Sequence, residues 1–260
     1  TVAVIGMGLV GQIVSRILDA YGCDVIGYDV VDKQMEGTRL LSFIHSDDDH
    51  AVDMTKSLTH GRGVDKVIIT AAADSNAPMD LAAAIARDRG IICMIGVTRM
   101  NIDRRPYYER ELSFRIARSY GAGRYDPVYE EKGIDYPLGY VRFTEGRNIE
   151  EFVRLLAQGR LKVSDLITHE IPFEQAADAY EMITKNPNQE RYIGVLLKYS
   201  ENKGKWQNKV SGAGKKTKVS GGKICLGLIG AGNFVRSTML PVMKESGKYE
   251  FRGLATTGGV

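Results

Sequence analysis

Short apolar runs alternate with helix-like patterns along the first part of the chain. The runs are continuous, which is typical of strands that are buried on both faces of a sheet. Because such strands alternate with helices, the pattern predicts an α/β fold with a doubly wound parallel sheet of the Rossmann type. The expected strands are residues 2–5, 24–28, 65–70 and 91–95, with 41–44 and 112–117 as further candidates.

The helix expected after the first strand has a clear amphipathic pattern. Its apolar residues recur at i, i+3, i+4, i+7 and i+8, which places them on one face. They are Val10, Ile13, Val14, Ile17 and Leu18. Gly22 is expected to end this helix. Further helices are predicted over residues 48–59 and 77–87, the second with Pro78 in its first turn.

Beyond residue 117 the pattern becomes irregular. Residues 120–147 are rich in Gly, Tyr, Arg and Asp and predict a loop, and residues 120–136 are dense in groups that could bind a polar substrate. An ordinary solvated loop explains the same composition, so both interpretations stay open. The elements expected after it are a helix at 149–156, a strand at 166–171, a helix at 174–184 and a strand at 192–197.

Residues 200–222 lack apolar periodicity and are rich in Gly, Ser and Lys, which predicts a flexible linker. The net charge of +3 comes from this region, because residues 200–223 hold seven Lys and one Glu, a net +6, and leave −3 for the rest. A nucleic-acid-binding arm is the alternative. Trp206 is the single aromatic residue of the segment, so we expect no nucleic-acid partner.

The opening pattern returns after the linker. It consists of a strand at 223–230, a glycine turn at 230–232, a helix at 234–244 that Pro241 is expected to distort near its end, and a strand at 251–256. A single βαβ unit cannot bury both faces of its sheet. We therefore expect a truncated second Rossmann domain and a chain that is part of a longer protein. The predicted domains are 1–147 (dinucleotide-binding, with a trailing loop), 148–199 (a C-terminal return segment), 200–222 (linker) and 223–260 (the start of the second domain).

Composition narrows the class of protein. No apolar run approaches the roughly 20 residues that span a bilayer, and the N-terminus lacks a signal-peptide pattern, so we expect no membrane partner and a cytoplasmic location. The cysteines, Cys23, Cys93 and Cys225, are far apart and are expected to be small buried residues in a reducing compartment. With no CxxC pair and only four histidines, the chain predicts no metal site.

The motif Gly6-Met-Gly8-Leu-Val-Gly11 joins the first expected strand to the amphipathic helix, and Asp29 follows Gly11 by 18 residues at the end of the next strand. In this fingerprint Gly6 permits a tight turn, Gly8 lets the backbone approach a pyrophosphate, and Gly11 lets the helix pack closely on the sheet. Asp29 would accept hydrogen bonds from ribose hydroxyls and repel a 2′-phosphate, which favours NAD over NADP. A glycine turn in an α/β fold of another function is the alternative.

A related motif, Gly230-Ala-Gly232-Asn-Phe-Val235, departs from the fingerprint at Val235, and Thr256 and Thr257 stand where an acid would favour NAD. It predicts a site for NAD or NADP, with a plain glycine turn as the alternative. The candidate cofactor-binding residues are Gly6, Gly8, Leu9, Val10, Gly11, Asp29, Thr70, Ala71, Gly96 and Val97 in the first domain, and Gly230, Gly232, Asn233 and Phe234 in the second.

Other nucleotide-binding classes fit less well. A short-chain dehydrogenase needs Tyr and Lys four residues apart, but Gly133 follows Tyr129 and Tyr140 follows Tyr136 at that spacing. A Walker A lysine is also absent from the sequence. A methyltransferase can share the glycine turn and the acid, but the complete GxGxxG spacing favours a dinucleotide-binding domain.

Residues 1–199 resemble the cofactor domain and C-terminal return of the medium-chain, zinc-type alcohol dehydrogenases. The resemblance rests on GMGLVG, Asp29, the strands IITAAA and IICMIGV, and the closing pattern FEQAADAYEMI…IGVLLKY. Residues 223–260 resemble the start of the glucose-fructose oxidoreductase and inositol dehydrogenase family. Joined by the linker, the two resemble the bi-domain oxidoreductases of bacterial surface-polysaccharide pathways, which RSYGAGRYDP and EEKGIDYP also fit.

The resemblance implies an NAD-dependent oxidoreductase that transfers hydride between the nicotinamide and an alcohol or carbonyl group. The implied substrate is a small molecule such as a sugar or nucleotide-linked sugar, and a homo-oligomer is a further expectation. Catalytic residues, and any zinc ligands, would lie outside these 260 residues, so we name none and expect this chain alone to be inactive. A non-catalytic NAD-binding or redox-sensing module is the alternative.

Overall fold

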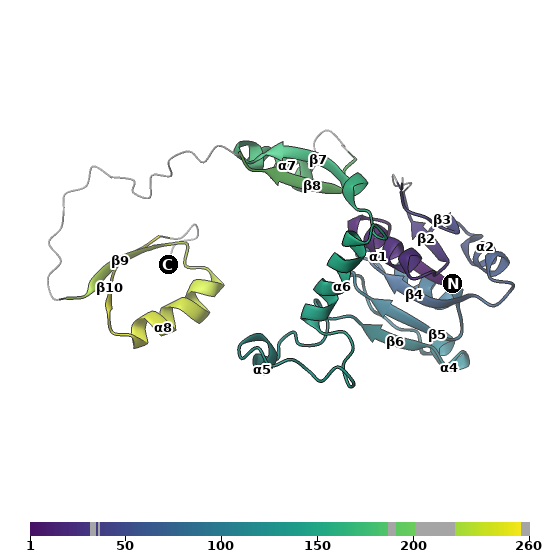
Figure 1. The fold of residues 1–260 in the computed structure, drawn as a ribbon, viewed down its shortest axis with the longest axis horizontal. Helices are drawn as coiled ribbons and strands as arrows, with labels where there is room; N and C mark the ends of the chain where they lie inside the picture. The colour runs from purple at the N-terminus through teal and green to yellow at the C-terminus, as the bar shows by residue number, and fades with distance from the viewer. Residues whose placement is uncertain (32–34, 36, 187–190, 201–221, 256–260) are drawn as a thin grey trace. The chain divides into compact units, whose positions relative to one another are not determined.

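The computed structural model describes residues 1–31, 35, 37–186, 191–200 and 222–255 (Figure 1). The chain divides into two compact units, Thr1–Glu201 and Asn202–Val260, which are described separately. Residues 201–221 of the predicted linker, and Thr256 and Thr257 of the second motif, lie outside the described residues.

The first unit contains eight strands among its described residues. They are β1 (Val2–Ile5), β2 (Val25–Asp29), β3 (Ser42–His45), β4 (Val64–Ile69), β5 (Ala86–Met94), β6 (Ser113–Ile116), β7 (Ile167–Pro172) and β8 (Gly194–Lys198). The helices between them are α1 (Leu9–Ala20), α2 (Ala51–Leu58), α3 (Ala77–Ile85), α4 (Arg104–Glu109), α5 (Pro127–Glu130), α6 (Glu145–Ala157) and α7 (Ala176–Lys185), with short 3₁₀ turns at η1 (Ser164–Leu166) and η2 (Phe173–Gln175).

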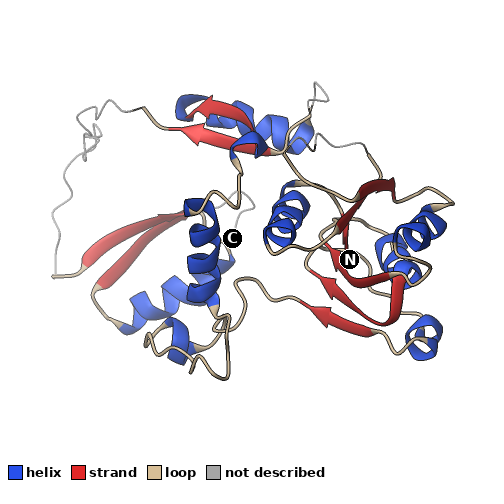
Figure 2. Ribbon diagram, turned by 45° about the vertical axis from the view of Figure 1, so that its right-hand side comes forward, coloured by secondary structure: helices blue, strands red, loops and turns tan. Residues whose placement is uncertain are grey.

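Six of the strands form one parallel sheet in the order β3-β2-β1-β4-β5-β6. This order reverses direction between β1 and β4, as in a doubly wound Rossmann sheet. Figure 2 shows helices on both sides of the sheet. The predicted fold class is therefore confirmed. The strands β7 and β8 pair in parallel as a separate two-stranded sheet.

The central strand β1 is buried on both faces, which explains its continuous apolar sequence. Ala3 and Ile5 pack in a core cluster with residues of α2 and α3, such as Ala51 and Met79. Val4 points to the opposite face and packs against Val14 and Leu18 of α1. The alternation of side chains along a strand thus divides one apolar run between two cores.

The predicted helix at 77–87 ends earlier than expected. The helix α3 stops at Ile85, and Ala86 already pairs with Val64 as the start of β5. Arg110 explains the stop, because its guanidinium donates to the carbonyl oxygens of Ala83, Ala84 and Ala86 at the end of α3. Such a cap from a distant side chain is invisible in the local sequence.

The helix α5 forms within the predicted loop and α4 where no element was predicted, and α6 begins four residues before its predicted start. The carboxylates of Asp103 and Asp126 cap α4 and α5 by accepting from the backbone N–H groups of Arg105 and Val128. These are ordinary N-cap contacts, and the Asp-Pro pair at the start of α5 is a signal that the sequence contained.

A buried ion pair ties α1 to the segment before β7. The side chain of Arg16 is 4% exposed and donates to both carboxylate oxygens of Asp165, at 2.6 and 2.5 Å. It also donates to the carbonyl oxygen of Lys162 and to the hydroxyl of Thr38. These bonds satisfy a charge that is otherwise costly to bury, so residues 162–165 of the predicted return segment are anchored to α1.

We expect Asp165→Asn to lower the free energy of unfolding by about 1–2 kcal/mol, because it removes the negative charge that Asp165 places beside the buried guanidinium of Arg16, while partial exposure of the aspartate limits the loss. The Arg16 guanidinium holds the pKa of Asp165 below its usual value. The stabilisation is therefore complete above the usual aspartate pKa and is lost as the pH falls through the lower, folded-state pKa. Urea unfolding of the unmutated chain and of Asp165→Asn across this pH range should show that the difference in their free energies of unfolding shrinks in acid. A constant difference would contradict the ion-pair explanation.

The second unit contains β9 (Ile224–Ile229), a π-helical turn η3 (Val235–Met239), α8 (Leu240–Glu245) and β10 (Tyr249–Ala255). The strands β9 and β10 are parallel, so the predicted strand–turn–helix–strand order is confirmed. The predicted continuous helix is wrong in its first half, where Leu240 N–H bonds back to Val235 in a wider turn. Pro241 lacks an N–H and cannot complete an α-helical bond to Ser237, so the regular helix begins beside it.

Apolar side chains of the second unit remain exposed. Ile229 is 93% and Phe234 67% exposed, and Val242 lies in α8 with similar exposure. A unit that buries so little apolar surface gains little hydrophobic stabilisation to offset the conformational entropy that the chain loses on folding.

A peptide of residues 223–260 is therefore expected to show a random-coil circular dichroism spectrum and no cooperative thermal transition. Residues 1–200, which contain both core clusters, are the matched control and should melt cooperatively. A sharp transition of the peptide would show that these residues are a complete small domain.

Candidate functional site

A cleft of about 520 Å³ lies at the carboxyl ends of the central strands. It occupies the point between β1 and β4 where the strand order reverses, which is where ligands bind in open α/β sheets. The lining residues come from the ends of β1, β2, β3 and β4 and from the first turns of α3. They are Ile5, Gly6, Gly8, Asp29, Val30, Val31, Ser46, Asp47, Thr70, Ala71, Ala72, Ala73, Ser75, Ala77, Pro78 and Leu81.

Two glycines of the first motif are required by packing within the chain. Gly6 has φ +98°, and a Cβ added there would lie 2.6 Å from the backbone nitrogen of Ala71. A Cβ at Gly11 would lie 1.8 Å from the carbonyl oxygen of Gly6. Any other residue at either position would force the turn, the start of α1 or the end of β4 to move.

Gly8 differs from its two neighbours in the motif. Its φ of −70° is accessible to any residue, and an added Cβ would meet no atom within 4 Å. Gly8 nevertheless lines the cleft. Its small size therefore keeps space open beside the cleft and is not needed for packing among the described residues.

The N-terminus of α1 is suited to an anion. Gly8 occupies the N-cap position without a side-chain cap, and the first turn contains no acidic residue. The first backbone N–H groups and the positive end of the helix dipole thus favour negative charge here. Leu9 and Val10 are partly exposed in this turn but, like Gly11, do not line the cleft. Only their backbone N–H groups could therefore bind a ligand in the cleft.

Asp29 both lines the cleft and braces the glycine turn. Its Oδ2 accepts from the backbone N–H of Met7 at 2.7 Å, and its Oδ1 accepts from that of Val31 at 3.2 Å. Asp47, which follows β3, adds a second carboxylate to the lining, and no Lys or Arg is among the described lining residues. This end of the cleft is therefore acidic.

Thr70 and Ala71 fix the opposite side of the turn. The Thr70 hydroxyl donates to the carbonyl oxygen of Gly6 at 2.5 Å, and the backbone N–H of Ala71 donates to that of Ile5 at 3.0 Å. Both residues also line the cleft. The structure thus places them beside the predicted motif, with a bracing role that the sequence did not reveal.

Gly96 and Val97 lie at the same sheet edge but do not line the cleft. A Cβ at Gly96 would lie 2.1 Å from the carbonyl oxygen of Ala71, and the backbone N–H of Val97 donates to that oxygen at 3.1 Å. The side chain of Val97 is 78% exposed. Gly96 and Val97 therefore pack the chain after β5 against the segment after β4.

The sequence analysis did not name the other lining residues as site candidates. They are Ile5, Val30, Val31, Ser46, Asp47, Ala72, Ala73, Ser75, Ala77, Pro78 and Leu81. A usable signal for most of them was their position just after a predicted strand, because the carboxyl ends of parallel strands meet at one edge. Apolar residues on both sides of the cleft could enclose a flat apolar group.

In the second unit, Gly230 has φ +82° and donates its backbone N–H to the carbonyl oxygen of Ala255 at 2.7 Å. Among the described residues, no atom lies within 4 Å of an added Cβ at Gly230 or Gly232. The carbonyl oxygen of Asn233 accepts from Ser237, and Phe234 is largely exposed. The predicted glycine turn is present, with space around it.

Among the described residues, no group of three or more His, Cys, Asp and Glu side chains could hold a metal ion. The described helices include none that is long and apolar enough to cross a membrane.

No family model and no curated protein matches the chain. Solved structures that match it include zinc dependent alcohol dehydrogenase 2 from Streptococcus pneumonia (20% identity, TM-score 0.55, 77% of this chain and 52% of that one). Galactitol-1-phosphate dehydrogenase from Escherichia coli matches at 20% identity and TM-score 0.54, over 72% and 50% of the two chains. A protein described as short chain alcohol dehydrogenase (RspB) from E. coli CFT073, solved with NADH, matches at 20% identity and TM-score 0.56, over 76% of this chain and 51% of that one.

The chain spans about half the length of each of these structures. At such identities the likeness shows a shared fold. The predicted resemblance of residues 1–199 to medium-chain alcohol dehydrogenases is supported at that level, while the resemblance of residues 223–260 to a second family stays a prediction.

Proposed function

We propose that the first unit is the cofactor-binding domain of an NAD-dependent oxidoreductase. The observation that carries the proposal is Gly8, which lines the cleft at the N-terminus of α1 although packing within the described chain does not require a glycine there. A pyrophosphate that lies against the backbone would be the reason for a glycine at this position, because a side chain would occupy its space. The fold shared with dehydrogenases, one of them solved with NADH, supports the same conclusion.

The cleft residues suit the parts of a dinucleotide. The N-terminal N–H groups of α1 would hold the pyrophosphate, and Asp29 would accept hydrogen bonds from the ribose hydroxyls while it keeps its bond to Met7. Val30 and Val31 on one side and Pro78 and Leu81 on the other would enclose the adenine. Bound NAD supplies the hydride acceptor, and the chain's contribution is to bind and orient it.

The substrate of the proposed oxidoreductase is an alcohol or carbonyl compound. The names of the matching structures include alcohol dehydrogenases and a sugar-alcohol phosphate dehydrogenase. The predicted resemblance to bi-domain enzymes extends this proposal to a sugar or nucleotide-linked sugar in surface-polysaccharide synthesis. It also extends to a second dinucleotide site, for NAD or NADP, at Gly230, Gly232, Asn233 and Phe234, and to assembly as a homo-oligomer.

Gly8→Val is expected to weaken NADH binding by more than about 100-fold, because its side chain would occupy the space proposed for the pyrophosphate; such a change corresponds to nearly 3 kcal/mol. The fold should survive, since no atom of the described residues lies within 4 Å of a Cβ added at Gly8. Fluorescence titration with NADH measures the affinity, and thermal melting checks the fold. Gly139→Val is the matched control, because Gly139 is exposed with equally open surroundings. Unchanged NADH affinity in Gly8→Val would place the site elsewhere.

The unmutated chain is expected to bind NADH more tightly than NADPH, since the carboxylates of Asp29 and Asp47 repel a 2′-phosphate. Asp29→Ser should narrow or reverse the preference. Asp29→Asn is the sharper variant, because the amide oxygen can still accept from Met7 while the charge is removed. Tighter NADPH binding by the unmutated chain, or an unaltered preference in both variants, would contradict the assignment of Asp29.

A further inference from the structure

Met7, which stands between the first two glycines of the motif, is held by hydrogen bonds on both sides although it does not line the cleft. Its backbone N–H donates to Asp29 Oδ2 at 2.7 Å, and its carbonyl oxygen accepts from Gln12 Nε2 at 3.1 Å. The Met7 side chain is fully buried and packs beside Val25. The backbone of Met7 is thus fixed between the carboxylate proposed to bind ribose and a side chain of α1.

The hydrogen bonds continue from Gln12 to a buried cation. The Thr38 hydroxyl donates to Gln12 Oε1 at 3.3 Å and accepts from Arg16 Nε at 2.9 Å. Gln12 and Arg16 are buried, and neither they nor Thr38 line the cleft. In this network, Arg16–Thr38–Gln12–Met7–Asp29, each residue donates to the next, from a guanidinium to a carboxylate. The bonds therefore polarise one another in the same direction.

The outer end of the network is fixed by the segment before β7. Arg16 also donates to both carboxylate oxygens of Asp165. Gly37, which precedes Thr38, has φ +76°, and a Cβ added there would lie 2.8 Å from Asp165 Oδ2. The turn that carries Thr38 consequently packs directly on the ion pair, which holds the hydroxyl beside the cation.

The inner end of the network orients the Asp29 carboxylate. The bond from Met7 is the shorter of the two that this carboxylate makes among the described residues, since the N–H of Val31 lies 3.2 Å from Oδ1. The direction of the carboxylate therefore depends on where the Met7 backbone lies. Gln12 sets that position, and Thr38 in turn holds the side-chain amide of Gln12.

From these contacts we infer that Thr38 and Gln12 are positioning residues for the dinucleotide, which hold Met7 so that Asp29 is oriented for the ribose hydroxyls before the cofactor binds. The inference rests on the proposed function of the cleft. A preorganised group binds more tightly because less ordering is required on binding. Loss of the Thr38 hydroxyl is therefore expected to weaken NADH binding although Thr38 does not line the cleft.

The test uses the 260-residue chain and two substitutions of one residue. Thr38→Val removes the hydroxyl and is expected to weaken NADH binding about three- to tenfold, the range for one or two ordinary hydrogen bonds. Thr38→Ser keeps the hydroxyl and should bind NADH within about twofold of the unmutated chain. Thr184→Val is the matched control, because the Thr184 hydroxyl also bonds within the chain, in α7 and outside the network. Fluorescence titration measures the affinity, and thermal melting checks the fold.

Cofactor preference separates positioning from a general effect on stability. A displaced Asp29 carboxylate loses the ribose hydroxyls of NADH and repels a 2′-phosphate less effectively. Thr38→Val should therefore narrow the preference for NADH over NADPH, with NADPH affinity changed by less than about twofold. In a chain that already carries Asp29→Ser, adding Thr38→Val should weaken NADH binding by less than about twofold, because the network then lacks its inner end.

Hydrogen exchange tests the network without any cofactor. In Thr38→Val the backbone amide of Met7 should exchange about fivefold or more faster, relative to that of Ile92 in β5, because its position is less restrained. Ile92 is buried in the main core cluster and reports on opening of the sheet. Thr38→Ser should leave the ratio of the two exchange rates unaltered.

Three results would overturn the inference. They are unaltered exchange at Met7 in Thr38→Val, an equal loss of affinity for NADH and NADPH, and the same loss of NADH affinity with and without Asp29→Ser. Failure of the unmutated chain to bind NADH would instead contradict the proposed function. The exchange rate at Met7 would still decide whether Thr38 positions Met7 and Asp29, so the two failures are distinguishable.

Discussion

The arrangement of the first unit depends on how closely three backbone segments approach one another at the glycine turn. Gly6 lies against Ala71, and Gly11 lies against Gly6, at separations that exclude any Cβ. This contact brings the end of β1, the start of α1 and the end of β4 to one point. The N-terminus of α1 consequently reaches the cleft where the strand order reverses, and an open space remains beside Gly8.

The side chains that hold this turn are also those proposed to meet the cofactor. Asp29 bonds to Met7 and Thr70 bonds to Gly6, while both line the cleft. Binding and local stability are therefore coupled at these residues, and a substitution can alter either. The comparison of Asp29→Asn with Asp29→Ser is informative for this reason, because the two differ in whether the acceptor for Met7 is retained.

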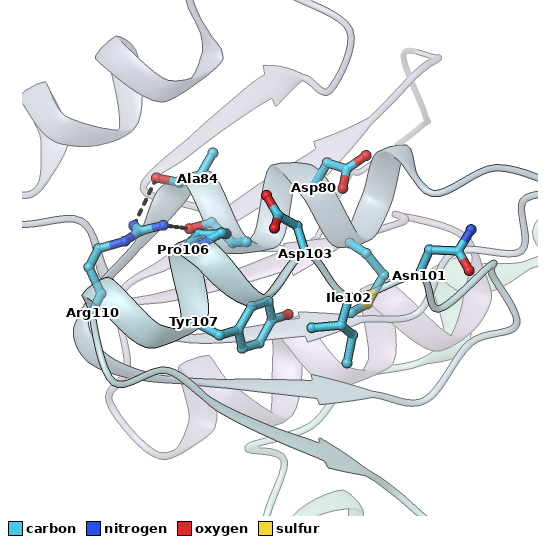
Figure 3. A pocket seen from close by; sticks show the side chains of 10 residues that line it. Asp80, Ala84, Asn101, Ile102, Asp103, Pro106, Tyr107 and Arg110 are labelled. Carbon is cyan, nitrogen blue, oxygen red and sulfur yellow. Dashed lines mark hydrogen bonds between the residues drawn. The ribbon is translucent and has the colours of Figure 1, made fainter.

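The helix α3 separates two cavities of the first unit. Pro78 and Leu81 line the cofactor cleft, whereas Met79, Asp80 and Ala83 line a second cavity of about 320 Å³ beside α4 (Figure 3). Residues at neighbouring positions of a helix point in different directions, so one helix contributes a wall to each cavity. Arg110 donates to the carbonyl oxygens at the carboxyl end of this helix.

The sequence by itself determined the fold class and the core of the candidate site, because apolar periodicity, glycine spacing and the acid after β2 are local features. It indicated Gly6, Gly8, Gly11 and Asp29, all within 29 residues of the N-terminus. Tertiary structure alone decided that Arg110 would end α3 and that Arg16 would pair with Asp165 across 149 residues. It also decided that Gly96 would pack behind the cleft and not line it. These outcomes depend on groups that are distant in sequence and meet only after the sheet has formed, so no local pattern records them.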